Sequence, residues 1–380
     1  MLLSPRIRAT PAPPIPAARA WAARYGGELG PSIDLTQAVP GYPPHPEMLE
    51  RLARAAGTRE AAGYGDIMGD PALREALAED MADFYGAPIA ADEVAITAGC
   101  NLAFVMAMTA LAGAGSAVML PAPWYFNHHM ALTIAGIETV PLPCLAEDGF
   151  VPDPERAEAL LTPQLRAIVL VTPNNPTGAI YPAEIIARFA ELCRARGLWL
   201  VLDETYRDFL PDARPHALFS DPGWRDGVVQ LYSFSKSYCI PGHRVGAIAA
   251  GAEAMGELAK VLDTMQICPS RTPQIALAWA IGALREWREG NRAVMAGRAA
   301  TFRQAMARAP AWSIDALGAY FAYLRIPDGE AMAQAERLAA ERGLCSLPGP
   351  FFGPGQERHL RLAFANAELD AIAEVPARLG

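Results

Sequence analysis

Seven short apolar runs lie between residues 94 and 249, and they restrict the fold more than any other feature of the chain. Each run has four or five residues, and longer stretches separate them. One such stretch places Ile186, Phe189 and Cys193 on one face of an amphipathic helix. Strands that are apolar almost throughout, rather than at alternate positions, are typical of a parallel sheet with helices on both faces. The sequence therefore predicts an α/β fold with a mostly parallel sheet sandwiched by helices. The runs are 94–97, 116–120, 139–142, 167–171, 198–202, 228–232 and 245–249.

The segment before the first run is expected to be partly irregular. The stretch 1–16 is rich in proline and alanine, and we interpret it as an extended arm. A short strand is expected at 33–37, and a helix is expected to begin at Pro46. Asp70 is expected to cap a helix that runs to about Tyr85.

The segment after about residue 250 is expected to be mainly helical and to end in a compact α+β unit. The expected helices are 273–284, 291–307 and 330–342, and the expected strands are 320–325 and 359–364. The chain then divides into three parts: 1–45 as the N-terminal arm and part of the small domain, 46–285 as the large domain, and 286–380 as the C-terminal small domain.

Charge and cysteine content exclude several classes of function. A net charge of −9 and a pI of about 5.3 argue against nucleic acid or an anionic membrane as a partner. The six cysteines show no CxxC pair and no Cys/His spacing of a metal site, so we expect reduced thiols and no metal. No apolar run is long enough to span a membrane, and no signal peptide is recognisable. These features predict a soluble, cytoplasmic protein.

Lys236 is one of only two lysines in the chain, against 30 arginines. It follows the run 228–232 in a serine-rich segment. An arginine keeps its proton in a protein, whereas a lysine can lose it and attack a carbonyl carbon to form a Schiff base. A chemical role for Lys236 is therefore one interpretation. An ordinary surface lysine is the alternative, and it fits Lys260 in the helix-like segment 253–260.

Polar residues follow several of the apolar runs, and ligands bind at the carboxyl ends of strands in open parallel sheets. Gly99-Cys100-Asn101 precedes an apolar helix, so its backbone N–H groups could bind an anion such as phosphate, although many ordinary turns look the same. Trp124-Tyr125-Phe126 could be core or could stack on a planar ligand. Asn174-Asn175 could cap a turn or offer an amide. Asp203 could be a helix cap or a buried carboxylate that needs a partner.

Taken together, these residues meet the requirements of pyridoxal 5′-phosphate. Its phosphate needs N–H donors and an arginine, its ring needs a stacking face, its pyridine nitrogen needs an acid and its aldehyde needs a lysine. Arg244, eight residues after Lys236, supplies the arginine.

The same residues form motifs that resemble those of the class I/II aminotransferases, enzymes of fold type I in the aspartate aminotransferase superfamily. The resemblance extends over nearly the whole chain. It implies pyridoxal 5′-phosphate as cofactor, 46–285 as the domain that binds it, amino-acid and 2-oxo-acid substrates, and a homodimer with shared active sites. The motifs are Asn174-Asn175-Pro176-Thr177-Gly178, Asp203-Glu204-x-Tyr206 and Ser233-x-Ser235-Lys236 with Arg244, together with Tyr64, Gly69, Gly99, Pro123 and Arg361.

The resemblance implies a catalytic role for three residues. Lys236 would bind the cofactor covalently and, once substrate has displaced it, would carry the 1,3-proton transfer between substrate and cofactor. Asp203 would pair with the protonated pyridine nitrogen. Tyr206, together with Asn175, would donate hydrogen bonds to the phenolic oxygen of the cofactor.

The resemblance also implies residues that hold the cofactor. Tyr125 would be the stacking aromatic, with Trp124 as the alternative, and His128 or its neighbour His129 would support Asp203. Tyr64 would reach the phosphate of the neighbouring subunit. The remaining cofactor-binding residues, most of them around the phosphate, are Gly99, Cys100, Asn101, Ser233, Ser235 and Arg244.

Substrate contacts are implied by the same resemblance. Arg361 would bind the substrate α-carboxylate, with Asn175 nearby. Ala38 lies where many relatives carry glycine, so its methyl group narrows that corner. A second arginine for a distal carboxylate could be Arg271. Alternatively, an aromatic or bulky side chain would suit a group of aromatic residues: Tyr42, Trp124, Tyr125 and Phe126.

The leading hypothesis is therefore an aminotransferase that moves the amino group of an L-amino acid to a 2-oxo acid by a ping-pong route. A lyase or decarboxylase on the same fold is the alternative, since Lys236, Asp203 and Arg244 are common to both. A binding protein that kept the fold is disfavoured because it could tolerate arginine in place of Lys236.

Overall fold

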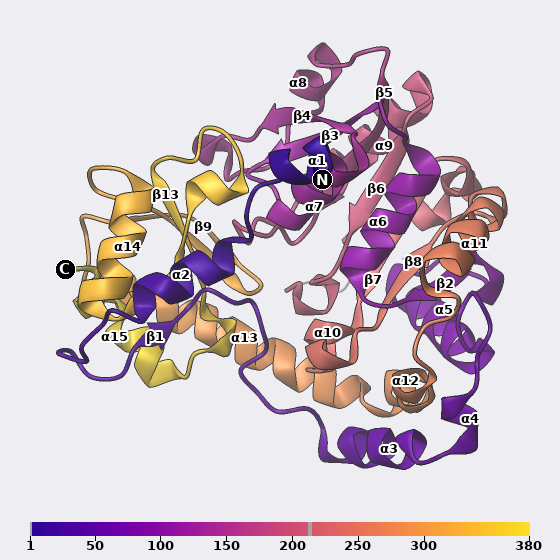
Figure 1. The fold of residues 1–380 in the computed structure, drawn as a ribbon, viewed down its shortest axis with the longest axis horizontal. Coiled ribbons are helices and arrows are strands. Elements are labelled where there is room, and N and C mark those ends of the chain that lie inside the picture. The colour runs from indigo at the N-terminus through magenta and orange to yellow at the C-terminus, as the bar shows by residue number, and fades with distance from the viewer. Residues whose placement is uncertain (1, 212–214) are drawn as a thin grey trace.

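The computed structural model describes residues 2–211 and 215–380, and its largest sheet contains all seven apolar runs. The strand order is β2-β8-β7-β6-β5-β3-β4 (Figure 1). Neighbouring strands are parallel, except that β8 is antiparallel to both β2 and β7. The prediction of a mostly parallel sheet is confirmed. The strands are β2 (Val94–Thr97), β3 (Ala117–Ala122), β4 (Glu138–Pro143), β5 (Leu165–Val171), β6 (Trp199–Asp203), β7 (Val228–Ser233) and β8 (Gly246–Ala249).

Helices cover both faces of this sheet, and successive residues of one strand point into different cores. Ile168 and Leu200 pack in the core beneath α5, α9 and α12, whereas Val169 and Val201 pack in the core beneath α6 and α11. Because both faces are buried, the strands are continuously apolar. The covering helices are α5 (Pro71–Tyr85), α6 (Cys100–Leu111), α9 (Ala183–Arg196), α11 (Ala252–Gln266) and α12 (Arg271–Ala283).

A second, antiparallel sheet has the order β12-β13-β10-β9, and β1 pairs with β11 beside it. Its core contains Phe302, Leu338, Leu360 and Ile372. Helix α13 runs from α12 beside the large sheet to α15 beside this one (Figure 1). The elements are β1 (Ile33–Asp34), β9 (Ser313–Gly318), β10 (Phe321–Arg325), β11 (Leu344–Cys345), β12 (Leu347–Pro348), β13 (His359–Ala363), α13 (Arg285–Met306), α14 (Ala331–Arg342) and α15 (Leu369–Leu379).

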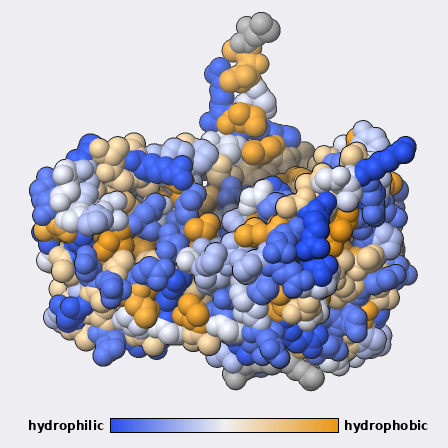
Figure 2. Space-filling view, turned by 90° about the horizontal axis from the view of Figure 1, so that it is seen from below, coloured by the Kyte–Doolittle hydropathy of each residue, from blue (hydrophilic) through white to orange (hydrophobic). Residues whose placement is uncertain are grey.

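The prediction of an extended N-terminal arm is wrong, because the segment forms α1 (Pro5–Ala9) and α2 (Pro14–Ala22). Both helices carry proline in the first turn, where the missing N–H group costs nothing and the fixed φ favours a helix. Helix α1 lies against α7 (Phe126–Ala135), and Arg6 donates a hydrogen bond to the carbonyl oxygen of Ala135. The start of the chain stands off the body as a narrow column (Figure 2).

The remaining helices include α3 (Pro46–Ala56), which begins at the predicted proline, α4 (Arg59–Ala62), α8 (Pro154–Ala159) and α10 (Phe234–Ser237). Helix α5 ends at Tyr85 as expected, but Asp70 does not cap it through its side chain. The Asp70 carboxylate instead accepts a hydrogen bond from Nε of Arg271, because an arginine is a stronger partner than a backbone N–H group. Within the described part of the chain, no helix has the length and apolar character needed to cross a membrane.

Candidate active site

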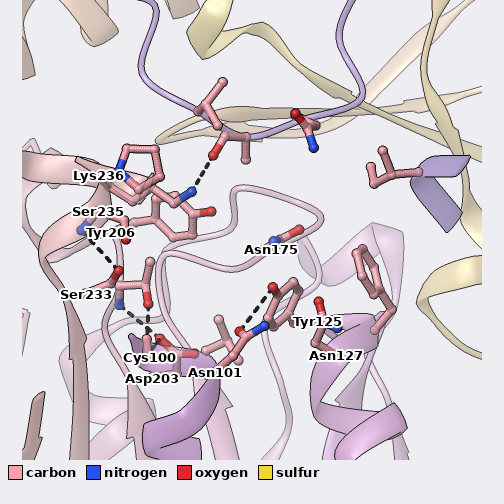
Figure 3. Close-up of a pocket in the computed structure, with 18 of the residues that line it drawn as sticks. Cys100, Asn101, Tyr125, Asn127, Asn175, Asp203, Tyr206, Ser233, Ser235 and Lys236 are labelled. Atoms are coloured by element: carbon pink, nitrogen blue, oxygen red, sulfur yellow. Dashed lines mark hydrogen bonds between the residues drawn. The ribbon is translucent and has the colours of Figure 1, made fainter. Parts of the chain in front are cut away.

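A cavity of about 380 Å³ opens at the carboxyl ends of β5, β6 and β7. The segments that follow these strands line it, together with the 36–39 loop, the start of α6, the arm and β13 (Figure 3). Most of the site residues that the sequence predicts therefore come together. Those lining the cavity are Ala38, Cys100, Asn101, Tyr125, Asn175, Asp203, Tyr206, Ser233, Ser235, Lys236, Arg244 and Arg361.

Lys236 lies on α10, directly after β7, and its side chain points into the cavity (Figure 3). Its Nζ donates a hydrogen bond to the carbonyl oxygen of Ala38. Burial, followed by the positive charges of Arg361 and Arg244, lowers the pKa of the Lys236 amine to about 8. An appreciable fraction of the amine is therefore unprotonated near neutral pH, as a nucleophile or a general base requires.

Asp203 is the last residue of β6 and is buried. Its Oδ2 lies 3.2 Å from Nε2 of His128, and its Oδ1 accepts a hydrogen bond from the backbone N–H of Thr205. Burial alone would raise the pKa of Asp203, but the hydrogen bond and charge of His128 and the bonds from Thr205 outweigh burial and lower the pKa. The carboxylate is therefore held ionised inside the protein.

His128 is the histidine that supports Asp203, and His129 faces elsewhere. The ring of His128 is buried and stacks on Phe104 with centroids 3.9 Å apart. Nδ1 of His129 bonds to Thr139, and its ring stacks on Trp124. The two neighbours diverge because successive residues of α7 point about 100° apart around the helix axis.

A corner of the cavity lies where α6 and α10 begin. Gly99 has a φ of +92°, and a Cβ atom there would collide with the guanidinium of Arg244. A Cβ atom on Gly246 would likewise collide with the backbone of Cys100. Gly99 therefore leaves room for the Arg244 guanidinium beside the first turn of α6, and Gly246 lets β8 lie against the backbone of Cys100. The hydroxyl-bearing residues Ser233 and Ser235 line the same corner, which suits a phosphate group.

Arg361 on β13 brings a buried guanidinium into the cavity, with an exposed fraction of 2%. Nη1 donates to Oδ1 of Asn175 over 3.2 Å, and Nη2 donates to the carbonyl oxygen of Thr36. Nε is buried and has no partner among the described residues. Burial lowers the pKa of Arg361 to about 10, against the opposing effect of Tyr206 and other groups. A buried guanidinium with spare donors is suited to a carboxylate.

Two tyrosines lie on different sides of the cavity (Figure 3). The hydroxyl of Tyr125 donates to Oδ1 of Asn101 over 3.3 Å, and burial raises the pKa of Tyr125 to about 12. Tyr206 follows β6 and packs against Tyr320, and burial raises its pKa well above the usual value. Both phenols are therefore protonated and able to donate hydrogen bonds at neutral pH.

Several residues singled out in the sequence lie outside the cavity. Tyr64 is 82% exposed, and Trp124 lines a neighbouring cavity instead. Tyr42 does not line the cavity either, and its ring packs edge-to-face on Trp287. Arg271 does not line this cavity, and its guanidinium is bound by Asp70 and Glu60. A role for Arg271 toward a distal carboxylate stays a prediction.

The cavity also has wall residues that carried no signal in the sequence. Pro13, Pro14 and Ile15 reach it from the start of α2, and Asn127 reaches it from α7. Nothing in their local pattern marks them as site residues. The position of Pro13, Pro14 and Ile15 depends on how the arm packs, and that of Asn127 depends on which side of α7 faces the cavity. Thr205, between Asp203 and Tyr206, could have been found by its place in the motif.

A buried polar network lies behind the end of β6. Glu204, next to Asp203, is fully buried and accepts hydrogen bonds from Tyr85 and Gln230. Nε2 of His216 lies 3.3 Å from Oε1 of Glu204. Burial would raise the pKa of Glu204, but the charge and hydrogen bond of His216, with Tyr85, lower it.

The network continues through two buried arginines. Arg207 and Arg288 both pair with Asp80, at 3.0 and 2.8 Å. Arg288 also pairs with Asp208 at 2.9 Å, and Asp208 accepts a hydrogen bond from the hydroxyl of Tyr232. These contacts tie α5, α13 and the segment after β6 together beneath the cavity floor.

Comparisons with known proteins place the chain in a family of enzymes. The family described as aminotransferase class I and II matches residues 31–379. An arginine–pyruvate transaminase of Pseudomonas aeruginosa is 32% identical over 302 residues, which cover 79% of this chain and 77% of that protein. An aromatic aminotransferase of Arabidopsis thaliana is 27% identical and covers 93% and 90%. The structure of the Thermus thermophilus aspartate aminotransferase with maleate is similar, with a TM-score of 0.90, 26% identity and coverage of 100% and 98%.

Proposed function

Because the chain belongs to the class I and II aminotransferases and moves an amino group between an amino acid and a 2-oxo acid, we propose that it does so with pyridoxal 5′-phosphate bound at Lys236. The observation that carries this proposal is that Lys236, Asp203 and Arg361, which are far apart in the sequence, line one cavity. When bound, the cofactor supplies an aldehyde that accepts amino groups and a ring that withdraws electrons.

The residues of the cavity fit this cofactor. The corner formed by Gly99, Ser233, Ser235 and Arg244 offers N–H, hydroxyl and guanidinium donors to a phosphate. Asp203 offers an ionised carboxylate in a buried position. His128 is its partner within the chain, and the protonated pyridine nitrogen of the cofactor would be a second, cationic partner. The chain therefore provides a partner for each polar group of the cofactor.

Asp203 would bind the pyridine nitrogen and hold a proton there. Its lowered pKa keeps the carboxylate ionised, so a proton shared with the nitrogen stays on the nitrogen. His128 orients the carboxylate from the other side, since it lies against Oδ2 while Thr205 binds Oδ1. His128 therefore acts on the ring only through Asp203.

Tyr206 and Asn175 would donate hydrogen bonds to the phenolic oxygen of the cofactor. The raised pKa of Tyr206 keeps its hydroxyl protonated. Asn175 presents its Oδ1 to Arg361, which leaves its amide N–H groups free to point the other way. Tyr125 would lie along the ring as the stacking residue.

Arg361 would bind the α-carboxylate of the substrate through two parallel hydrogen bonds. Its position on β13 and its bonds to Asn175 and Thr36 hold the guanidinium in a fixed orientation. The substrate α-carbon would then face Lys236. The Lys236 amine, with a pKa of about 8, would take the α-proton at Nζ.

Several further features belong to this proposal. A ping-pong sequence follows, because amino donor and 2-oxo acid would use the same carboxylate site in turn. We also propose a cytoplasmic homodimer in which Tyr64, exposed in the single chain, reaches the phosphate of the neighbouring subunit. The division into 1–45, 46–285 and 286–380 is proposed for the domains.

The proposal is tested with the holoenzyme and single amino acids. An L-amino acid that is a substrate should convert bound pyridoxal phosphate to the pyridoxamine form and release one equivalent of 2-oxo acid. A 2-oxo acid added afterwards should restore the original spectrum. Release of ammonia or CO₂ without the pyridoxamine form would support the lyase or decarboxylase alternative instead.

A further inference from the structure

Two glycine backbones meet where the loop after β5 contacts the second sheet. A Cβ atom on Gly178 would lie 2.5 Å from the backbone nitrogen and oxygen of Gly318, and 2.9 Å from the carbonyl oxygen of Phe321. A Cβ atom on Gly318 would collide with the carbonyl oxygen of Gly178. Main-chain atoms in a close-packed interior cannot turn aside as the end of a long side chain can. A methyl group on either glycine would therefore push the loop and the sheet apart.

The loop 172–179 contains Gly178 and is buried along its whole length. The backbone N–H of Thr172 donates to the carbonyl oxygen of Asp203, which fixes the loop to the end of β6. The side chain of Asn174 accepts hydrogen bonds from within the loop, and its backbone carbonyl oxygen accepts one from the N–H of Gly178. A loop held in this way is stiff, so a displacement at the glycine contact falls on the second sheet.

Gly318 belongs to the sheet that carries Arg361. It ends β9 and pairs with Phe321 on β10, and Phe321 pairs on its other side with Ala363 of β13. Arg361 lies two residues before Ala363 on the same strand. A displacement of Gly318 would therefore be passed across the hydrogen-bonded strands to Arg361.

The hydrogen bond between Arg361 and Asn175 crosses the same boundary. Nη1 of Arg361 donates to Oδ1 of Asn175 over 3.2 Å, and both side chains are buried. A contact of about 3.6 Å is no longer a hydrogen bond, so a displacement of about 0.5 Å would break this one. The length of this bond therefore depends on how closely the two glycine backbones approach.

We propose that Gly178 and Gly318 are positioning residues that set the separation of Asn175 and Arg361, and so direct the guanidinium toward the substrate α-carboxylate. Neither glycine lines the cavity, and each acts only through those two side chains. This inference rests on the proposed function, since it concerns the carboxylate that Arg361 would bind.

Gly318→Ala is the test variant, because the φ of Gly318 lies outside the left-handed region whereas that of Gly178 is +80°. Each standard L-amino acid is first tried in the half-reaction of the wild-type holoenzyme, and the one with the highest kcat/KM is then used. The concentration that gives half the maximal rate should rise at least tenfold in Gly318→Ala, because a misdirected guanidinium loses a charged hydrogen bond to the carboxylate.

Two further readouts separate this effect from a general loss of structure. The affinity of apoprotein for pyridoxal phosphate should change less than threefold in Gly318→Ala, because the stiff loop and the large sheet keep their places. The limiting rate should fall by a smaller factor than the half-saturation concentration rises. Gly297→Ala is the matched control, since a Cβ atom there meets open space, and it should keep the wild-type values.

A double-mutant comparison shows whether the effect passes through Arg361. In an Arg361→Lys background the guanidinium is already absent, so adding Gly318→Ala should lower kcat/KM less than threefold, against at least tenfold in the wild type. If Gly318→Ala does not fold, Gly178→Ala places a methyl group at the same boundary from the loop side and takes its place. Its positive φ adds a cost in stability, which unfolding measures separately.

Three results would overturn the proposal. The first is a wild-type half-saturation concentration in the folded variant, and the second is an equal loss of kcat/KM in the Arg361→Lys background. The third is a loss of cofactor affinity as large as the loss of substrate affinity. In all three cases the wild-type half-reaction, and with it the proposed function, would stand. If the wild-type holoenzyme converted no amino acid, the proposed function itself would fail, and this inference with it.

Discussion

Nε2 of His128 lies 3.2 Å from Oδ2 of Asp203, and both side chains are buried at the end of the large sheet. The pair joins the start of α7 to the end of β6. Burial alone would raise the pKa of the Asp203 carboxylate, and the contact with His128 explains why the pKa is lowered instead.

Replacing His128 by phenylalanine should shift the acid limb of the pH–rate profile to higher pH. The ring stack on Phe104 would remain, while the hydrogen bond to Asp203 would be lost. A hydrogen bond to a charged group is worth about 1.5–3 kcal/mol, so the pKa of Asp203 should rise by about one to two units. Since the carboxylate is needed in its ionised form, activity would be lost at a higher pH on the acid side. His129→Phe, which removes a bond to Thr139 only, should leave the limb in place.

Gly99→Ala should weaken cofactor binding at least tenfold. The residue has a φ of +92°, and its Cβ would displace the Arg244 guanidinium that faces the phosphate corner. A residue with a Cβ atom at this positive φ also raises the conformational energy of the backbone by about 1–2 kcal/mol. Titration of the apoprotein with pyridoxal phosphate measures the effect. Gly113→Ala is the control, since a Cβ atom there meets open space, and equal affinities for the two variants would contradict the role of Gly99.

Lys236→Met should stabilise the cofactor-free protein at neutral pH, although it removes the reactive amine. The Lys236 pKa falls from 10.5 to about 8 on folding, so folded protein holds the charged amine at a cost of about 3 kcal/mol. Below pH 8 the full cost applies. Between pH 8 and 10.5 the unfolded state binds more protons, so the stability of the wild type rises with pH relative to the variant.

Urea unfolding of both proteins at several pH values measures this difference. The advantage of Lys236→Met should be largest at pH 7 and should vanish near pH 10.5. A constant difference across this range would contradict a lowered pKa for Lys236.

Arg288→Met should lower the free energy of unfolding by about 3–5 kcal/mol, because it leaves the half-buried Asp208 without its cationic partner and leaves the buried Asp80 with Arg207 alone. Arg24→Met, which breaks the exposed pair with Glu336, should cost about 0–1 kcal/mol. Chemical unfolding of both variants makes the comparison. Similar losses would mean that the network beneath the cavity contributes no more than a surface ion pair.

The sequence predicted the large sheet because its strands are buried on both faces and are therefore apolar at every position, as in Ile168 and Val169. The residues at the strand ends could be picked out as site candidates because their motifs follow one another in the order typical of the aminotransferase family. The arm was wrongly expected to be extended, since proline in a first helical turn looks like proline in a coil.

Other features depend on contacts between distant segments, and no local pattern encodes them. The choice between His128 and His129 follows from which face of α7 turns toward β6. The engagement of Arg271 by Asp70 depends on residues 201 positions apart, and Pro14 reaches the cavity only because the arm packs across it.

The central claim is that Lys236 binds the cofactor, and peptide mapping after borohydride reduction of the holoenzyme tests it most directly. Reduction fixes the bond between lysine and cofactor, and mass spectrometry of the digest then locates the added mass. The account predicts the cofactor mass on Lys236, none on Lys260, and no labelled peptide from Lys236→Ala. A label on Lys260, or an undiminished label and turnover in Lys236→Ala, would contradict it.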